Sequence, residues 1–231
     1  MTQSVRAGMI ANLPVAASVG VYGSVLGVLA AQKSISWSTL LMMNLSIFAG
    51  SAQFVMVDMW TPPLPIVEMT AAVLMINLRY LLIGASLKPV FKNTSIWHKL
   101  GVMHLVADEN WAVTMAAHRN GKATTGFLFG GGICLVTIWC FGTMLGHTLG
   151  NAVTNPEAYA LDFAFIAVFT ALAVSLFRGA KDILPWLVAA IVAAVTEHWI
   201  PGKWYVLSGG VSGALMAVFH NPMRKGLKND D

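Results

Sequence analysis

Charged side chains are scarce in this sequence. Asp, Glu, Lys and Arg together make up 10% of its 231 residues, whereas soluble domains carry about 25%. Hydrophobic residues make up 57%, and four long stretches contain no charged side chain: residues 13–31, 34–57, 123–156 and 204–223. Because a spanning helix needs about 20 apolar residues, these stretches exclude an ordinary soluble domain. They predict an all-α, polytopic transmembrane helix bundle.

Motifs for catalysis and cofactor binding are also missing. Neither the phosphate-binding pattern G-x-x-x-x-G-K-[ST] nor the zinc-protease pattern H-E-x-x-H occurs, so we expect no enzyme activity, no catalytic residue and no cofactor. Cys134 and Cys140 lie six residues apart, on different faces of a helix, which favours a packing role over a disulfide or a metal site. The net charge of +4 comes from basic residues in short connecting segments without interleaved aromatics, which argues against nucleic-acid binding.

Polar and proline-rich breaks divide the chain into eight apolar segments. We expect about seven spans, with a range of six to eight, from residues 13–31, 38–60, 66–87, 100–117, 123–147, 161–177, 183–199 and 204–220. Basic residues favour the cytoplasmic side, which places the loops at Lys88, Arg119 and Arg178 and the C-terminus inside. The loops at 61–65 and 148–160 lack basic residues and are expected outside. This scheme requires segment 100–117 to re-enter the membrane or to lie at its surface, and it leaves the N-terminal side open.

The sequence "SIFAGSAQF" (Ser46–Phe54) interrupts the second apolar segment. Its small residues weaken helix preference, and irregular backbone inside a membrane is tolerated only where it is buried in protein or lines a cavity. The pattern predicts at least one broken or re-entrant helix, with Ser51 and Gln53 beside the break. The alternative is a tight helix crossing in which Ser51 bonds back to its own helix.

Glycines recur at four-residue spacing in several apolar segments. The rows are Gly23 and Gly27; Gly126 and Gly130; Gly142, Gly146 and Gly150; and Gly209 and Gly213. Such rows let helix backbones approach closely in lipid. We expect them to pack helices, with a gating hinge as the alternative.

Two groups of polar residues lie in apolar surroundings. Arg79 is the only basic residue deep inside an apolar segment, so it needs a protein or water partner, unless it reaches the cytoplasmic end as a snorkelling side chain. His104 and Asp108, four residues apart, would share one face of a continuous helix with Trp111, next to Glu109. A carboxylate near an imidazole suits proton exchange; the alternative is an interfacial helix whose acids meet water.

Three motifs carry a resemblance to a known family. "FAGSAQF" (Phe48–Phe54), "INLRY" (Ile76–Tyr80) and "ADENWA" (Ala107–Ala112) occur in an order, and in a chain of a size, that resemble the AzlC family. This family supplies the large subunit of two-component branched-chain amino acid exporters, including the YgaZ-type valine exporters. The resemblance covers roughly residues 5–220. It implies a single transmembrane transporter domain over residues 1–231, with a short polar cytoplasmic tail at residues 221–231.

The resemblance also implies a function and a partner. We expect export of valine, leucine and isoleucine, with methionine as a further candidate, across the bacterial inner membrane, driven by the proton gradient. The expected partner is a small AzlD-type membrane subunit. The implied substrate-binding residues are Ser51, Gln53, Asn77 and Arg79, the last against the substrate carboxylate, and the implied proton-coupling residues are Asp108, Glu109 and His104. The alternative function is a membrane channel for a small solute, although a channel needs a ring of polar pore residues and the polar groups here cluster in few segments.

Overall fold

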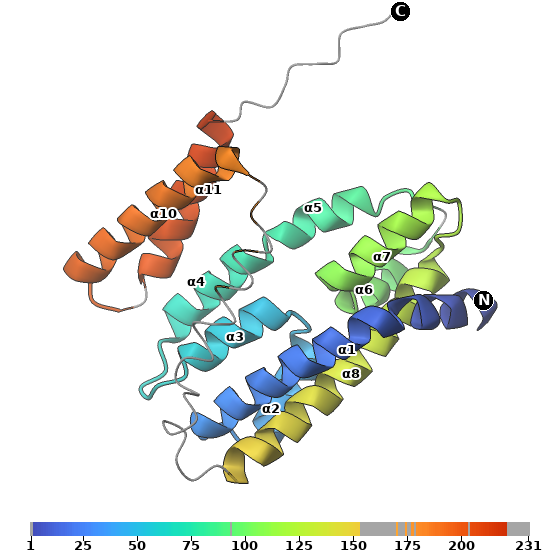
Figure 1. The fold of residues 1–231 in the computed structure, drawn as a ribbon, viewed down its shortest axis with the longest axis horizontal. Helices are drawn as coiled ribbons and strands as arrows, with labels where there is room; N and C mark the ends of the chain where they lie inside the picture. Colours follow the sequence, from blue (N-terminus) through green and yellow to red (C-terminus); the bar gives the residue numbers. More distant parts are fainter. Residues whose placement is uncertain are drawn as a thin grey trace, which may run out of the picture. The chain divides into compact units, whose positions relative to one another are not determined.

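The computed structural model describes residues 2–92, 94–152, 179–202 and 204–220, together with residues 170, 174 and 177. All regular secondary structure in this part of the chain is helical (Figure 1), which confirms the all-α prediction there. The helices are α1 (Thr2–Gln32), α2 (Trp37–Ser46), α3 (Gly50–Asp58), α4 (Ile66–Asn77), α5 (Arg79–Ser86), α6 (Ile96–His104), α7 (Asp108–Arg119), α8 (Thr125–Ala152), α10 (Ala180–Trp199) and α11 (Trp204–His220).

Three helical stretches are long and apolar enough to cross a membrane: Gln3–Gln32, Ile66–Ser86 and Thr125–Gly150. The count of about seven spans stays a prediction. The apolar segment 161–177 lies largely outside the described residues, and the polar tail 221–231 lies wholly outside them. The chain forms two compact units, residues 1–60 with 76–165 and residues 61–75 with 166–231, and the single transporter domain stays a prediction.

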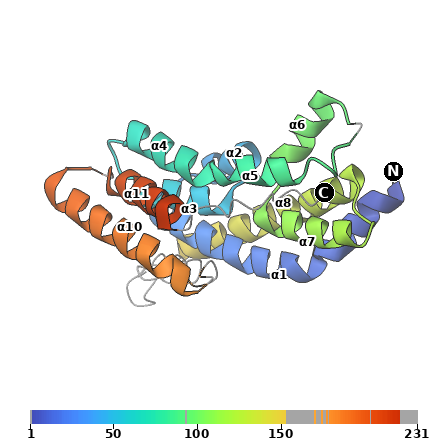
Figure 2. The same ribbon diagram turned by 90° about the horizontal axis from the view of Figure 1, so that it is seen from above.

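Helices α1 and α8 form the centre of the first unit and lie side by side in both views (Figures 1 and 2). They run parallel, because early residues of one contact early residues of the other and late residues contact late ones. A Cβ atom on Gly130 would overlap the backbone of Val5, and one on Gly146 would overlap that of Ser24. The predicted packing role of these glycines is therefore confirmed, since only glycine permits so close a backbone approach.

Helices α2 and α3 form a helical hairpin rather than one continuous helix. The chain leaves the helix at Ile47 and resumes it at Gly50, so the predicted interruption is confirmed and begins slightly before the Ala-Gly-Ser-Ala stretch. The far end of α3 returns to the start of the hairpin, where Lys33 Nζ donates to the Asp58 carbonyl at 3.2 Å. Both ends of the hairpin thus lie near the end of α8, where His147 Nε2 bonds the Ile35 carbonyl at 2.7 Å.

Helices α6 and α7 form a second hairpin that enters from the opposite end of α8. Its entrance lies at the start of α8, where Thr94 and Thr125 share a hydroxyl hydrogen bond of 3.2 Å. Its exit at Arg119 leads back to α8 after a short turn. The segment 100–117 therefore begins and ends on one side, as the distribution of basic residues requires, and it is apolar enough to pack on Leu87, Phe91 and Leu128 through Val102 and Val106.

The second unit contains the helix pair α10 and α11. Gly209 and Gly213 of α11 face Ala189 and Ala193 of α10, where a Cβ on either glycine would lie about 3 Å from its neighbours. The Ser208 hydroxyl donates to Thr196 Oγ1 at 2.8 Å across the pair. The predicted row of Gly209 and Gly213 thus also packs two helices.

Candidate functional site at the hairpin tips

The tips of the two hairpins meet near the middle of α8. His104 ends α6, and its Nε2 bonds the carbonyl of Leu45 near the end of α2 at 2.8 Å. Along α8, Gly132 faces Leu105 of one tip and Trp139 faces Gly50 of the other, and both positions lie in the central part of Thr125–Ala152. The two interruptions therefore contact α8 about 10 Å apart along its axis, at Gly132 and Trp139, within a helix that is long enough to span a membrane.

The predicted helical face shared by His104 and Asp108 is wrong. The helix ends at His104 and restarts at Asp108, with Leu105, Val106 and Ala107 outside it. The interruption has its own hydrogen bonds, because Asn110 Oδ1 accepts from the Ala107 amide at 2.8 Å and Asn110 Nδ2 donates to the Leu105 carbonyl at 2.9 Å. Asn110 is fully buried, so this one side chain satisfies two backbone groups that the break would leave unpaired.

Arg79 joins the two tips. Its Nη1 forms an ion pair with Asp108 Oδ2 at 2.5 Å, and its Nη2 donates to Ser51 Oγ at 2.8 Å. Three residues predicted from separate motifs, Ser51, Arg79 and Asp108, therefore meet at one place, which we call the tip site. Arg79 has the protein partner that its position demands, and its side chain is 33% exposed.

Two helix N-termini contribute to the tip site. Asp108 is the first residue of α7 and Ser51 the second of α3, so each lies where unpaired backbone N–H groups carry partial positive charge. Together with the Arg79 guanidinium, these ends form a site suited to a carboxylate. Asp108 offsets part of this positive charge when no other anion is bound.

Two polar atoms of Arg79 and of the nearby residue Asn77 are buried and unpartnered within the described part of the chain. They are Arg79 Nε and Asn77 Oδ1. The guanidinium also lies 5.4 Å from the centre of the Tyr80 ring, within cation–π range. Because buried polar groups normally have partners, these two atoms are candidates for contact with a ligand.

Glu109 and His104 lie beside this arrangement in different ways. Glu109 follows Asp108 in the first turn of α7 and is exposed, and no cation of the described residues lies within ion-pair distance of it. The Glu109 carboxylate is therefore accessible to protons. The His104 ring takes part in the contact between the tips. Its Nε2 is the donor there, because its partner, the Leu45 carbonyl, can only accept.

Gln53 belongs to a buried network that fixes the α2–α3 interruption. Gln53 Nε2 donates to Asn44 Oδ1 at 3.0 Å, and Trp139 Nε1 donates to Gln53 Oε1 at 2.8 Å and to Asn44 Oδ1 at 3.1 Å. Asn44 Nδ2 in turn donates to Thr143 Oγ1 at 2.7 Å. Gln53 and Asn44 have no exposed surface, so the structure places Gln53 behind the tip and ties it to α8.

Sequence reasoning missed several residues around the tips. Asn44, Asn110 and Trp139 hold the interruptions, and Tyr22 of α1 packs its ring on Phe54 and Trp139 at centroid distances of 4.6 and 5.9 Å. A signal existed for Asn110, because an Asp-Glu-Asn run is typical of the first turn of a helix. For the other three no local pattern exists, since their partners lie far away in the sequence.

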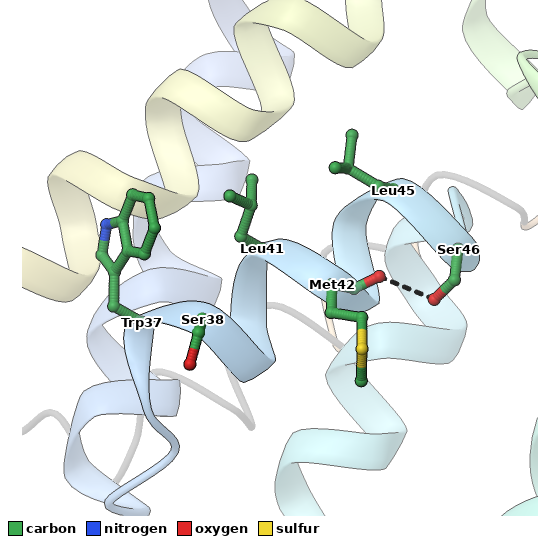
Figure 3. A pocket seen from close by; sticks show the side chains of 6 residues that line it. All are labelled: Trp37, Ser38, Leu41, Met42, Leu45 and Ser46. Atoms are coloured by element: carbon green, nitrogen blue, oxygen red, sulfur yellow. Dashed lines mark hydrogen bonds between the residues drawn. The ribbon is translucent and has the colours of Figure 1, made fainter.

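A surface groove of about 430 Å³ lies along α2 and ends at Leu45 and Ser46, next to the contact between the tips. Its lining residues all come from this one helix (Figure 3): Trp37, Ser38, Leu41, Met42, Leu45 and Ser46. The Ser46 hydroxyl donates to the Met42 carbonyl at 2.7 Å, so the only polar group near the tip end is used internally. The groove offers an apolar helix face and no chemistry for a polar ligand. Across the residues that the structure describes, no group of three His, Cys, Asp or Glu side chains is placed to hold a metal ion.

The fold and the tip site define a helical membrane protein in which two interrupted helix pairs meet at a charged centre. Residues 14–153 match the AzlC protein family, so the chain belongs to this family, whose members are membrane transporter components. The resemblance seen in the three motifs is thereby confirmed, and the matched region contains the whole tip site.

Two relatives from Helicobacter pylori carry the name "uncharacterized membrane protein". The one from strain J99 is 27% identical over 171 residues, which cover 73% of this chain and 74% of the relative. The one from strain 26695 is 26% identical over 187 residues, which cover 80% of each chain. These names agree with a membrane location. No solved structure matches the chain.

Proposed function

We propose that this chain is the large subunit of an exporter that moves valine, leucine and isoleucine out of the bacterial cytoplasm, with methionine as a further substrate. The observation that carries the proposal is the position of Arg79. One end of its guanidinium is held by Asp108 and Ser51, while Nε is buried and unpartnered. A zwitterion of moderate size meets this arrangement with its carboxylate, because Arg binds carboxylates through two adjacent N–H groups.

The partner groups for the substrate ammonium are acceptors. Asn77 Oδ1 is buried without a partner among the described residues, and Glu109 supplies an accessible carboxylate. In our proposal Asp108 holds Arg79 in place, and Glu109 takes either a proton or the substrate ammonium. Competition between the two cations for one carboxylate would couple inward proton flow to outward substrate flow. His104 then couples protonation to the contact between the tips.

The arrangement of hairpins supports an orientation. Since α1 and α8 run parallel, both begin on the same side, and Arg119 and Lys122 before α8 favour the cytoplasm. The α6–α7 hairpin then opens to the cytoplasm and the α2–α3 hairpin to the outside. With segment 161–177 counted as a span, this scheme has six spans and two re-entrant hairpins, and it keeps the C-terminus cytoplasmic.

The test is efflux of radiolabelled valine from cells preloaded with a valine-containing dipeptide. The chain is expressed alone and with its proposed AzlD-type small subunit, each with and without a protonophore. We expect faster valine efflux only when both chains are present, and we expect the protonophore to abolish this increase. Ser51→Ala and Asn77→Ala should reduce efflux without loss of membrane protein, while Ser38→Ala, on the exposed face of α2, should not.

Two outcomes would contradict the proposal. Unchanged efflux in every condition, with both proteins shown to be in the membrane, would exclude valine export. Efflux that persists with the protonophore, together with single-channel conductance in bilayers, would favour the channel alternative. Paired half-helices also occur in channels, but here the Arg79–Asp108 ion pair lies between the tips, which favours a gated exchange over a continuous pore.

A further inference from the structure

Tyr22 lies in the middle of α1, the helix that carries none of the family motifs. Its ring packs against Phe54, one turn after Ser51 on α3, and against Trp139 on α8. Tyr22 is also close enough to Arg79 and Glu109 to interact with both electrostatically. Tyr22 therefore brings α1 close to the tip site, whose charges come from other helices.

The hydroxyl of Tyr22 is buried and has no hydrogen-bond partner within the described part of the chain. Six buried side-chain atoms share this property there. Two of them, Tyr22 Oη and Arg79 Nε, belong to residues that interact electrostatically, and a third, Asn77 Oδ1, lies two residues before Arg79 in the sequence. An unpaired buried hydroxyl is unfavourable, because it loses its hydrogen bonds to water without replacement. Such a concentration of unpaired groups at one place indicates a surface that is complementary to a polar ligand.

The chemistry of these three atoms matches the backbone part of an α-amino acid. Tyr22 Oη and Arg79 Nε are donors, and a carboxylate accepts from both. Asn77 Oδ1 is an acceptor, and an ammonium group donates to it. The aromatic rings of Tyr22 and Phe54 provide an apolar surface beside these polar atoms, which suits an aliphatic side chain.

We infer that the Tyr22 hydroxyl donates a hydrogen bond to the carboxylate of the transported amino acid, next to Arg79, and that Tyr22 is a substrate-binding residue. This inference rests on the proposed function, because it takes an amino acid as the ligand. It adds α1 to the segments that contact substrate. It also explains why a tyrosine hydroxyl stays unpaired at the meeting point of the two hairpins.

The test uses Tyr22→Phe, which keeps the ring packing and removes only the hydroxyl. Binding of three ligands to the purified full-length protein is measured by calorimetry: valine, valinamide, which lacks the carboxylate, and isovalerate, which lacks the ammonium. A hydrogen bond to a charged group corresponds to an affinity change of about 10- to 100-fold. We expect Tyr22→Phe to weaken valine and isovalerate by this factor and to leave valinamide within about twofold. Tyr205→Phe on α11 serves as the matched control and should change none of the three.

Thermal unfolding supplies a second measurement on the same variant. Because the ligand-free hydroxyl is unpaired, Tyr22→Phe should unfold at the wild-type temperature or above it. A large drop would show that the hydroxyl is bonded within the protein and would overturn the inference. Wild-type valine affinity in Tyr22→Phe, or equal weakening of valine and valinamide, would also overturn it while leaving the proposed function intact. Failure of the wild-type protein to bind valine at all would instead overturn the proposed function and this inference with it.

Discussion

Replacement of Arg79 by lysine tests whether the geometry of the guanidinium, rather than its charge, makes the tip site. The structure uses Arg79 at three nitrogens: Nη1 on Asp108, Nη2 on Ser51, and Nε free for a ligand. Lysine keeps the positive charge but offers a single nitrogen on a flexible stem. It cannot hold Asp108 and present a second pair of N–H groups to a carboxylate.

The expected loss of valine affinity follows from the hydrogen bonds that lysine cannot make. A hydrogen bond between charged groups contributes about 1.5–3 kcal/mol. Because the Arg79 side chain is 33% exposed, solvent screening favours the lower part of this range. A loss of about 1.5–2 kcal/mol corresponds to valine affinity that is about 10- to 30-fold weaker.

The assay is equilibrium binding of radiolabelled valine to the purified protein, followed by the efflux measurement. Arg119→Lys is the matched control, because Arg119 ends the α6–α7 hairpin and is exposed, and this variant should bind valine as the wild type does. If Arg79→Lys and Arg119→Lys bind valine equally well, Arg79 serves only as a positive charge, and the bidentate carboxylate site is refuted.

Three further predictions concern the fold that supports the site. Gly146→Ala should lower the free energy of unfolding by about 1–3 kcal/mol, because the added Cβ would overlap Ser24 on α1. Thermal unfolding in detergent measures this change. The control is Gly101→Ala, which has open space around it and should leave the stability unchanged or raise it. Gln53→Leu should lower the free energy of unfolding by about 1–3 kcal/mol, because Asn44 and Trp139 lose a buried hydrogen-bond partner. Gln3→Leu, at an exposed position, should leave this free energy unchanged. Equal melting temperatures of the two variants would show that the network contributes nothing to stability. In a background without native cysteines, Ser36→Cys and Thr61→Cys should both react with an impermeant maleimide from outside the cell. Asn120→Cys should react only after the cells are permeabilised. Labelling of Ser36→Cys and Thr61→Cys from opposite sides would refute a re-entrant α2–α3 hairpin.

The interruption at Ser46–Phe54 is the part of the fold that could be predicted best from the sequence. Small residues next to polar ones in an apolar run have few uses in a membrane, so the composition of this stretch already indicates a break. The same reasoning fails at His104–Asp108, because alanine, leucine and valine there are compatible with an unbroken helix. The cause of that second break lies elsewhere: Gly132 on α8 leaves room for Leu105, and Asn110 replaces the lost backbone hydrogen bonds.

The meeting of Ser51, Arg79 and Asp108 illustrates both the reach and the limit of sequence reasoning. Arg79 needs a partner because a charge in lipid is costly. No pattern in the sequence around Arg79 identifies that partner as Asp108, which lies on the α6–α7 hairpin. Tyr22 gave no signal at all, since one tyrosine in an apolar helix is ordinary. Its role depends on Phe54 and Trp139, which lie far from it in the sequence and pack on it only in the folded protein.

The parallel pairing of α1 and α8 has a consequence for the order in which the protein is made. Ser24 and Gly146, which are in direct contact, are separated by 122 positions of the chain (146 − 24). At a synthesis rate of about 5–20 residues per second, α1 emerges roughly 6 to 24 seconds before its partner. During that interval the glycine face of α1 is in the bilayer without the helix that it fits, and neither hairpin has its central support. Helix α1 thus reaches its main packing partner only after α8 has been made, which makes the completion of α8 the step that commits the first unit to its fold.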